Sequence, residues 1–157
     1  MDDATLRKLV WEEMLYADMR ANYFGELVRR YLLLDKTLRV ATLVGTSGSL
    51  AAALLSSGPA KIAVPILATA LSLWLLISQY GTMARDASDL HEGWGSLARD
   101  YTDPWNSLDR PDAEACYLEI FNRGESLSKT GAKFPNKAKR LSFWLDHAAA
   151  MARARYA

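Results

Sequence analysis

Two long uncharged stretches dominate the hydropathy pattern of the chain. Residues 40–60 and 62–84 contain no Asp, Glu, Lys, Arg or His, and only Lys61 separates them. At about 1.5 Å of rise per residue, either stretch spans the roughly 30 Å hydrocarbon core of a bilayer when it is helical. The turn at 56–59 is too short for anything but an antiparallel hairpin. The pattern therefore predicts a transmembrane hairpin over residues 40–84, with spans at about 40–57 and 62–82.

Both flanks of this hairpin have helical periodicity. In residues 1–39 an apolar stripe advances by alternate threes and fours, which predicts one long amphipathic helix. The stripe comprises Leu6, Val10, Met14, Ala17, Ala21, Phe24, Val28 and Tyr31. Residues 85–157 predict a helical stalk and tail, with helices over 85–101, from Pro111 to about 128 and from Asn136 through Met151. Gly93 and Gly95 each cost about 1 kcal/mol in a helix interior, so we expect a bend there.

The fold class predicted from these elements is all-α: a membrane protein with a long N-terminal cytoplasmic helix, a hairpin and a helical C-terminal tail, forming a single functional domain. Whole-chain values of 50% hydrophobic residues and a net charge of +1 hide the separation between the nearly uncharged hairpin and its charged flanks. The second span is rich in Leu and Ile and should insert unaided. Thr, Ser and Gly dilute the first span, so its insertion should be marginal.

The distribution of basic residues predicts the orientation, because positive charge is retained on the cytoplasmic side. Only Lys61 lies in the turn, whereas five basic residues flank the hairpin: Arg29, Arg30, Lys36, Arg39 and Arg85. We therefore expect a multi-pass protein of the cell inner membrane with both termini in the cytoplasm. The polar N-terminal region predicts no cleaved signal. Cys116 is the single cysteine and forms no internal disulfide.

No motif in the chain predicts catalysis. His91 lies near Asp86, Asp89 and Glu92, but this spacing matches no known metal-ligand pattern and is typical of a solvated helix face. There is no phosphate-binding loop, nucleophile elbow or CxxC pair. We expect no enzyme activity, no catalytic, metal or cofactor-binding residue, and no nucleic-acid partner.

Small and polar residues within the spans are the main candidates for function. One set is a hydroxyl and amide stripe that could line a pore: Thr42, Thr46, Ser49, Ser56, Thr69, Ser72 and Gln79. A neighbouring face of small residues, Gly45, Gly48 and Ala52, is typical of close helix packing and predicts a homo-oligomer. The pattern leaves two alternatives open for the stripe, which are helix packing and the lining of a water-filled pore.

The C-terminal region carries a basic cluster of four residues: Lys133, Lys137, Lys139 and Arg140. One interpretation is contact with anionic lipid headgroups or another anionic ligand. The other is a solvated helix face whose charge is balanced by the acidic residues that precede it in the tail.

The order of elements resembles the SLATT domain, a two-transmembrane effector associated with bacterial nucleotide-signalling conflict systems. The resemblance covers about residues 5–105 and lies in the segment Tyr16-Ala17-Asp18-Met19-Arg20-Ala21-Asn22-Tyr23, in Asp35-Lys36-Thr37-Leu38-Arg39, and in the Thr/Ser/Gly-rich span that follows. It implies a homo-oligomeric pore-forming or ion-channel effector in antiviral defence, with the lipid bilayer and a separate nucleotide-signalling or sensor protein as partners. No sensor module is fused in this sequence. The alternatives are a non-conducting membrane adaptor that recruits a soluble partner through its cytoplasmic helices, and a soluble bundle that buries the hairpin.

Overall fold

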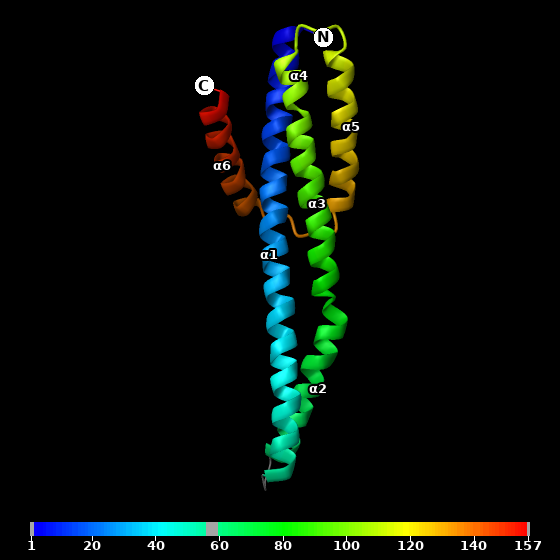
Figure 1. Ribbon diagram of the computed structural model, residues 1–157, viewed down its shortest axis with the longest axis vertical. Coiled ribbons are helices and arrows are strands. Elements are labelled where there is room, and N and C mark those ends of the chain that lie inside the picture. Colours follow the sequence, from blue (N-terminus) through cyan, green and yellow to red (C-terminus); the bar gives the residue numbers. More distant parts are fainter. Residues whose placement is uncertain (1, 56–59, 157) are drawn as a thin grey trace. The chain divides into compact units, whose positions relative to one another are not determined.

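The computed structural model describes residues 2–55 and 60–156, and these residues form helices and connecting turns without a strand. Figure 1 shows the helices in chain order. They are α1 (Asp3–Leu55), α2 (Ala60–Ser78), α3 (Tyr80–Asp100), α4 (Thr102–Asn106), α5 (Ala113–Gly131) and α6 (Ala138–Tyr156). The prediction of an all-α fold is confirmed. The chain divides into two compact units, which we name the bundle unit (Met1–Leu27 with Asp86–Ala157) and the hairpin unit (Val28–Arg85).

In the bundle unit, α1 is buried on more than one face. The predicted stripe is buried from Leu6 to Phe24. Met19, Tyr23 and Leu27 are also buried, although they lie outside that stripe. Figure 1 shows the reason: α3 and α5 lie on one side of α1, and α6 lies on the other. A helix between two sets of neighbours buries more than the single stripe expected of a surface helix.

Gly93 does not interrupt α3, which continues as a helix from Tyr80 to Asp100. Gly93 has a packing role instead. A Cβ on this residue would lie 2.9 Å from Cδ2 of Leu127 on α5, so the missing side chain allows α5 to approach. The next residue, Trp94, is only 2% exposed. Close packing of this helix pair offsets the helix-propensity cost of the glycine.

The C-terminal helices begin close to the predicted positions. α5 starts at Ala113, shortly after Pro111, and continues to Gly131, beyond the expected end near residue 128. α6 starts at Ala138, two residues beyond the expected cap Asn136. Contacts to α1 hold the connecting segment: the Tyr23 hydroxyl donates to the carbonyl of Pro135, and the Lys137 backbone N–H lies 3.5 Å from the same hydroxyl.

The hairpin unit contains the second part of α1, all of α2 and the first turns of α3. The two long helices run antiparallel, as predicted (Figure 1). They approach closely at Gly45, where a Cβ would lie 3.6 Å from Cβ of the buried Ala68. α2 ends at Ser78, before the end expected for the second span, and Gln79 takes a left-handed conformation with φ of 47°. This conformation is unfavourable for a residue with a side chain and separates α2 from α3.

Candidate membrane-facing surface

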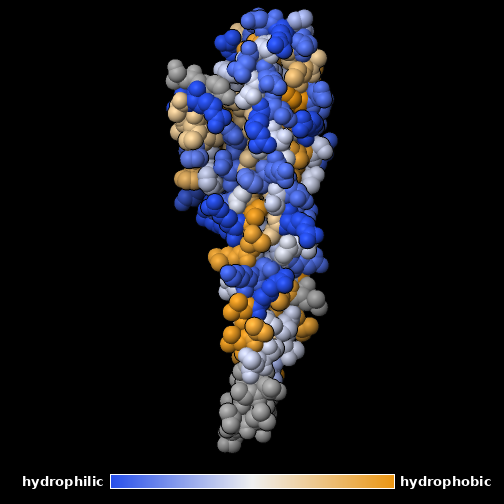
Figure 2. Space-filling view, in the orientation of Figure 1, coloured by the Kyte–Doolittle hydropathy of each residue, from blue (hydrophilic) through white to orange (hydrophobic). Residues whose placement is uncertain are grey.

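Large apolar side chains are exposed over much of the hairpin unit. Leu43 is 71% exposed and Ile77 is 74% exposed, the values of side chains with almost no protein neighbours. The full set is Leu32, Leu33, Leu34, Val40, Leu43, Val44, Ile66, Leu67, Leu73, Trp74, Ile77 and Met83. Figure 2 shows hydrophobic residues gathered over these helices. Asp35, Lys36 and Arg39 separate Leu34 from Val40 on α1, and Figure 2 shows hydrophilic residues between the hydrophobic ones. Exposed apolar surface of this extent marks an interaction site for lipid or for protein.

One helical stretch in the described part of the chain is long and apolar enough to cross a membrane. It begins at Pro65 and contains an 18-residue window with a mean hydropathy of 1.4, of which 6% is buried. The side chains of the first stretch lie outside the described residues from position 48 onward, so a second membrane span stays a prediction. α2 itself has 19 residues, or about 28 Å at 1.5 Å per residue, close to the hydrocarbon thickness of a bilayer.

The hydroxyl groups of the hairpin unit bond to the backbone of their own helix. Thr46 Oγ1 donates to the Thr42 carbonyl at 2.9 Å, and Ser47 Oγ to the Leu43 carbonyl at 2.9 Å. On α2, the corresponding bonds from Thr69 to Pro65 and from Ser72 to Ala68 measure 2.8 and 2.9 Å. A hydroxyl satisfied in this way needs no water, so these residues are compatible with an apolar solvent.

The structure brings part of the predicted polar stripe to one side of the hairpin. Thr46 follows Gly45, and Thr69 follows Ala68, at the point where the two helices touch. Each residue turns a helix by about 100°, and the helices are antiparallel, so both threonines project from the same side at the same level. Both are exposed.

The other predicted residues lie in different surroundings. Thr42 and Ser72 are half-buried, and the Thr42 Oγ1 is buried without a hydrogen-bond partner. Gln79 lies between α2 and α3 and not on the face of α2 where it was expected. Gly45 packs against its own chain, so its small size is used within the hairpin. The side chains of Gly48, Ser49 and Ala52, and the whole of Ser56, lie outside the described residues.

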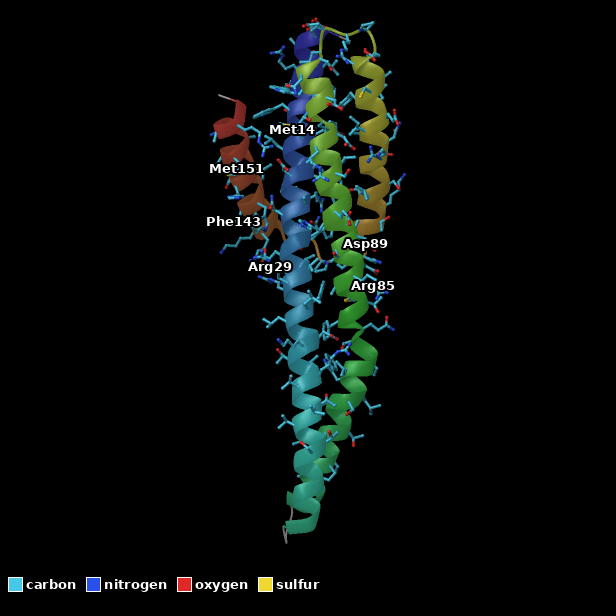
Figure 3. All side chains as sticks on the ribbon, viewed as in Figure 1. Met14, Arg29, Arg85, Asp89, Phe143 and Met151 are labelled. Atoms are coloured by element: carbon cyan, nitrogen blue, oxygen red, sulfur yellow. The ribbon has the colours of Figure 1, made fainter. Side chains whose placement is uncertain are left out.

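Charged and aromatic residues lie among and beside the exposed apolar residues at the start of the hairpin unit. Arg39 Nε donates to Asp35 Oδ2 at 2.8 Å, and Asp35 lies 3.6 Å from the position of a Cβ on Gly81. The Tyr31 and Tyr80 rings stack with centroids 6.2 Å apart. Figure 3 shows Arg29 on α1 and Arg85 on α3 at a similar level. Tyrosine and arginine at the end of an apolar surface are typical of a membrane interface.

Two members of the basic cluster in the tail form ion pairs within the bundle unit. Lys133 pairs with Asp86 of α3, and Arg140 pairs with Glu26 of α1. Glu26 also accepts a hydrogen bond of 3.0 Å from Trp144 Nε1. Lys137 and Lys139 are exposed. The carboxylates that neutralise these two residues come from α1 and α3, and not from the acidic part of the tail. Sequence spacing gave no means of finding these partners.

His91, the residue at the centre of the only metal-like cluster in the sequence, joins two helices. Its Nδ1 lies 2.7 Å from the Ala21 carbonyl of α1, and its ring lies 3.2 Å from the position of a Cβ on Gly25. No group of residues that could hold a metal ion occurs within residues 2–55 and 60–156. Burial raises the pKa of the half-buried Cys116 thiol, which favours its unreactive protonated form.

Comparison of the chain with protein-family models, with curated proteins and with solved structures found no match. The resemblance to the SLATT domain therefore stays a prediction.

Proposed function

We propose that the hairpin unit inserts into a bilayer with both helices and that several copies assemble into a pore, as the resemblance to the SLATT domain implies. The observation that supports this most strongly is the exposed apolar surface of the hairpin unit. A soluble bundle would bury its most apolar helix, whereas 6% of the apolar window that begins at Pro65 is buried here. Both chain termini would then lie in the cytoplasm of a bacterial cell.

Assembly follows from the size of the hairpin. Two helices enclose no lumen, so conduction requires neighbouring copies. The side of the hairpin that carries Thr46 and Thr69 is our candidate for the pore lining, because these hydroxyls are exposed next to the helix contact. An uncharged lining predicts weak ion selectivity and closure by narrowing and drying.

Leakage from liposomes that contain the purified protein tests this proposal. The wild type should release a small trapped dye. Thr46→Leu and Thr69→Leu should abolish release without reducing insertion, since each makes a span more apolar. Ser47→Leu is the matched control, because Ser47 has the same back-bonded hydroxyl but projects about 100° further round α1.

An absence of leakage and of membrane current from well-inserted wild type would overturn the pore proposal. Equal loss of leakage in the Ser47 variant would overturn the assigned lining. An absence of conduction would favour the alternative function, a membrane adaptor that recruits a soluble partner. Its support is the exposed apolar surface of α6, where Phe143 is 59% exposed and Met151 is 56% exposed (Figure 3).

A further inference from the structure

Charge is divided unevenly within the bundle unit. Residues 86–125 contain ten acidic and three basic residues, whereas residues 126–157 contain one acidic and seven basic residues. Part of this charge is neutralised between helices, as in the pairs of Lys133 with Asp86 and of Arg140 with Glu26. Other charged residues of both signs are exposed on α5 and α6. The proposed pore lining lies in the hairpin unit and uses neither of these helices.

α6 exposes apolar and basic side chains on the side that points away from the bundle. Ala148 is buried. At about 100° per residue, Ala150 points in almost the opposite direction, and it is exposed. Phe143 is 59% exposed and lies about 140° from Ala148. Arg153 is also exposed. We call Phe143, Ala150 and Arg153 the α6 surface.

α5 exposes apolar and acidic side chains in the same way. Ile120 is buried, whereas Leu118, two residues earlier, points in almost the opposite direction and is 49% exposed. Asn122, two residues after Ile120, is also exposed. Glu114 and Glu119 are exposed in the first half of α5, which contains no basic residue. We call Glu114, Leu118, Glu119 and Asn122 the α5 surface.

The two surfaces lie on opposite sides of the bundle unit. Figure 1 shows α5 and α6 antiparallel on either side of α1, with the C-terminal end of α6 level with the first half of α5. The basic end of α6 is therefore level with the acidic part of α5. One chain cannot bring its own two surfaces together, but two copies that lie side by side in the same orientation can. Exposed apolar residues and opposite charges then meet at the same level.

We propose that the α6 surface of one copy docks on the α5 surface of the next copy, so that the bundle units join head to tail. Phe143 and Leu118 supply the apolar contact, and Arg153 meets the acidic residues of α5. A contact between two different surfaces repeats from copy to copy and forms a ring when the rotation closes. The contact rests on the assembly of several copies proposed above. An anionic lipid would match the α6 surface alone, whereas a second copy matches both surfaces.

Cross-linking of the full chain in liposomes tests this contact. Asn122→Cys and Ala150→Cys are combined in a Cys116→Ser background and treated with a short bismaleimide. Because the two positions lie on opposite sides of α1, the reagent can join them only between copies. The double variant should give a ladder of dimers, trimers and larger species, whereas each single variant should stay monomeric. A monomeric double variant, or single variants that cross-link as well as the double variant, would overturn the head-to-tail contact.

Phe143→Ala and Leu145→Ala form a matched pair in this double-cysteine background. Both shorten an exposed apolar side chain of α6, but Leu145 lies only about 60° from the buried Ala148 and outside the α6 surface. The Phe143 change should lower the yield of trimers by about fivefold or more, and the Leu145 change by less than about twofold. Equal effects would overturn the assigned surface. A ladder without dye leakage would support the contact and count against the pore, whereas leakage without a ladder would count against the contact alone.

Discussion

The bundle unit and the hairpin unit use apolar side chains in opposite ways, although the single helix α1 passes through both. In the bundle unit, Val10 and Phe24 of α1 are at most 2% exposed. In the hairpin unit, Leu33 and Leu43 of the same helix are 67% and 71% exposed. α1 is a continuous helix from Asp3 to Leu55, so the difference in exposure lies in what surrounds it. The bundle unit supplies its own apolar environment, whereas the hairpin unit requires one from outside.

Ion pairs between separate helices stabilise the bundle unit. Arg123 of α5 pairs with Asp100 of α3 at 2.8 Å, and Lys133 pairs with Asp86 of α3. In the hairpin unit, the ion pair of Arg39 with Asp35 lies within one helix. Back-bonded hydroxyls do not distinguish the units, because the hydroxyl of Thr130 in α5 bonds to its own helix as that of Thr46 does in α1.

The largest expected effect is the loss of a core aromatic in the bundle unit. Phe24→Ala should cost about 3–5 kcal/mol of unfolding free energy, because it removes edge contacts to Phe134 and leaves a cavity. Leu33→Ala in the hairpin unit should change it by less than about 0.5 kcal/mol. Urea unfolding in micelles, followed by tryptophan fluorescence in a Trp74→Phe background, measures this, since every remaining tryptophan lies in the bundle unit. Similar losses of unfolding free energy in the two variants would contradict the difference between the bundle unit and the hairpin unit.

A charge placed on each exposed surface tests which solvent it faces. Leu43→Arg should disfavour insertion by about 2.5–3.5 kcal/mol and shift protein out of the carbonate-washed membrane fraction. Leu118→Arg on α5, where the leucine is 49% exposed, should leave that fraction unchanged. If both variants remain in the membrane fraction equally well, the apolar surface of the hairpin unit does not face lipid.

A leucine at Gly45 tests the contact between the two hairpin helices. Gly45→Leu should destabilise the hairpin unit by about 1–3 kcal/mol, because the side chain meets Ala68. Gly95→Leu is the matched control, since its nearest neighbour is the Arg99 guanidinium at 3.8 Å. Thermal unfolding by circular dichroism in micelles compares them. A lower melting temperature for the Gly95 variant than for the Gly45 variant would argue against the Gly45 contact.

The smallest expected effect is a pH dependence at Glu13 in the bundle unit. The pKa of Glu13 is raised above 4.5 by burial and by Glu12, so the folded protein binds its proton more tightly than the unfolded chain. Wild-type stability should therefore fall as the pH rises from 4.5 through the folded pKa. Glu13→Gln should be more stable than wild type at pH 7, and this gain should vanish below pH 4.5. Urea midpoints across pH measure it, and an unchanged gain at low pH would contradict the assignment.

The sequence by itself determined the helical class, the antiparallel hairpin and the buried stripe from Leu6 to Phe24, because these follow from local periodicity and from the shortness of the turn. Local signals did not reveal the packing role of Gly93, since helix propensity carries no information about Leu127, which is distant in sequence but adjacent in the fold. The same limitation applies to Gln79, whose left-handed conformation has no signal in the uncharged stretch around it.

Only the tertiary structure decided how the candidate site is assembled. The sequence named Gly45, Thr46 and Thr69, but the contact between Gly45 and Ala68 sets which of them face outward and on which side. Tertiary structure also selected Glu26 as the partner of Arg140, and it collected Glu13, Trp94 and Phe121 around one cavity. Periodicity assigns residues to the faces of single helices. Which faces meet depends on the packing of several helices at once, and no single segment of the sequence encodes that.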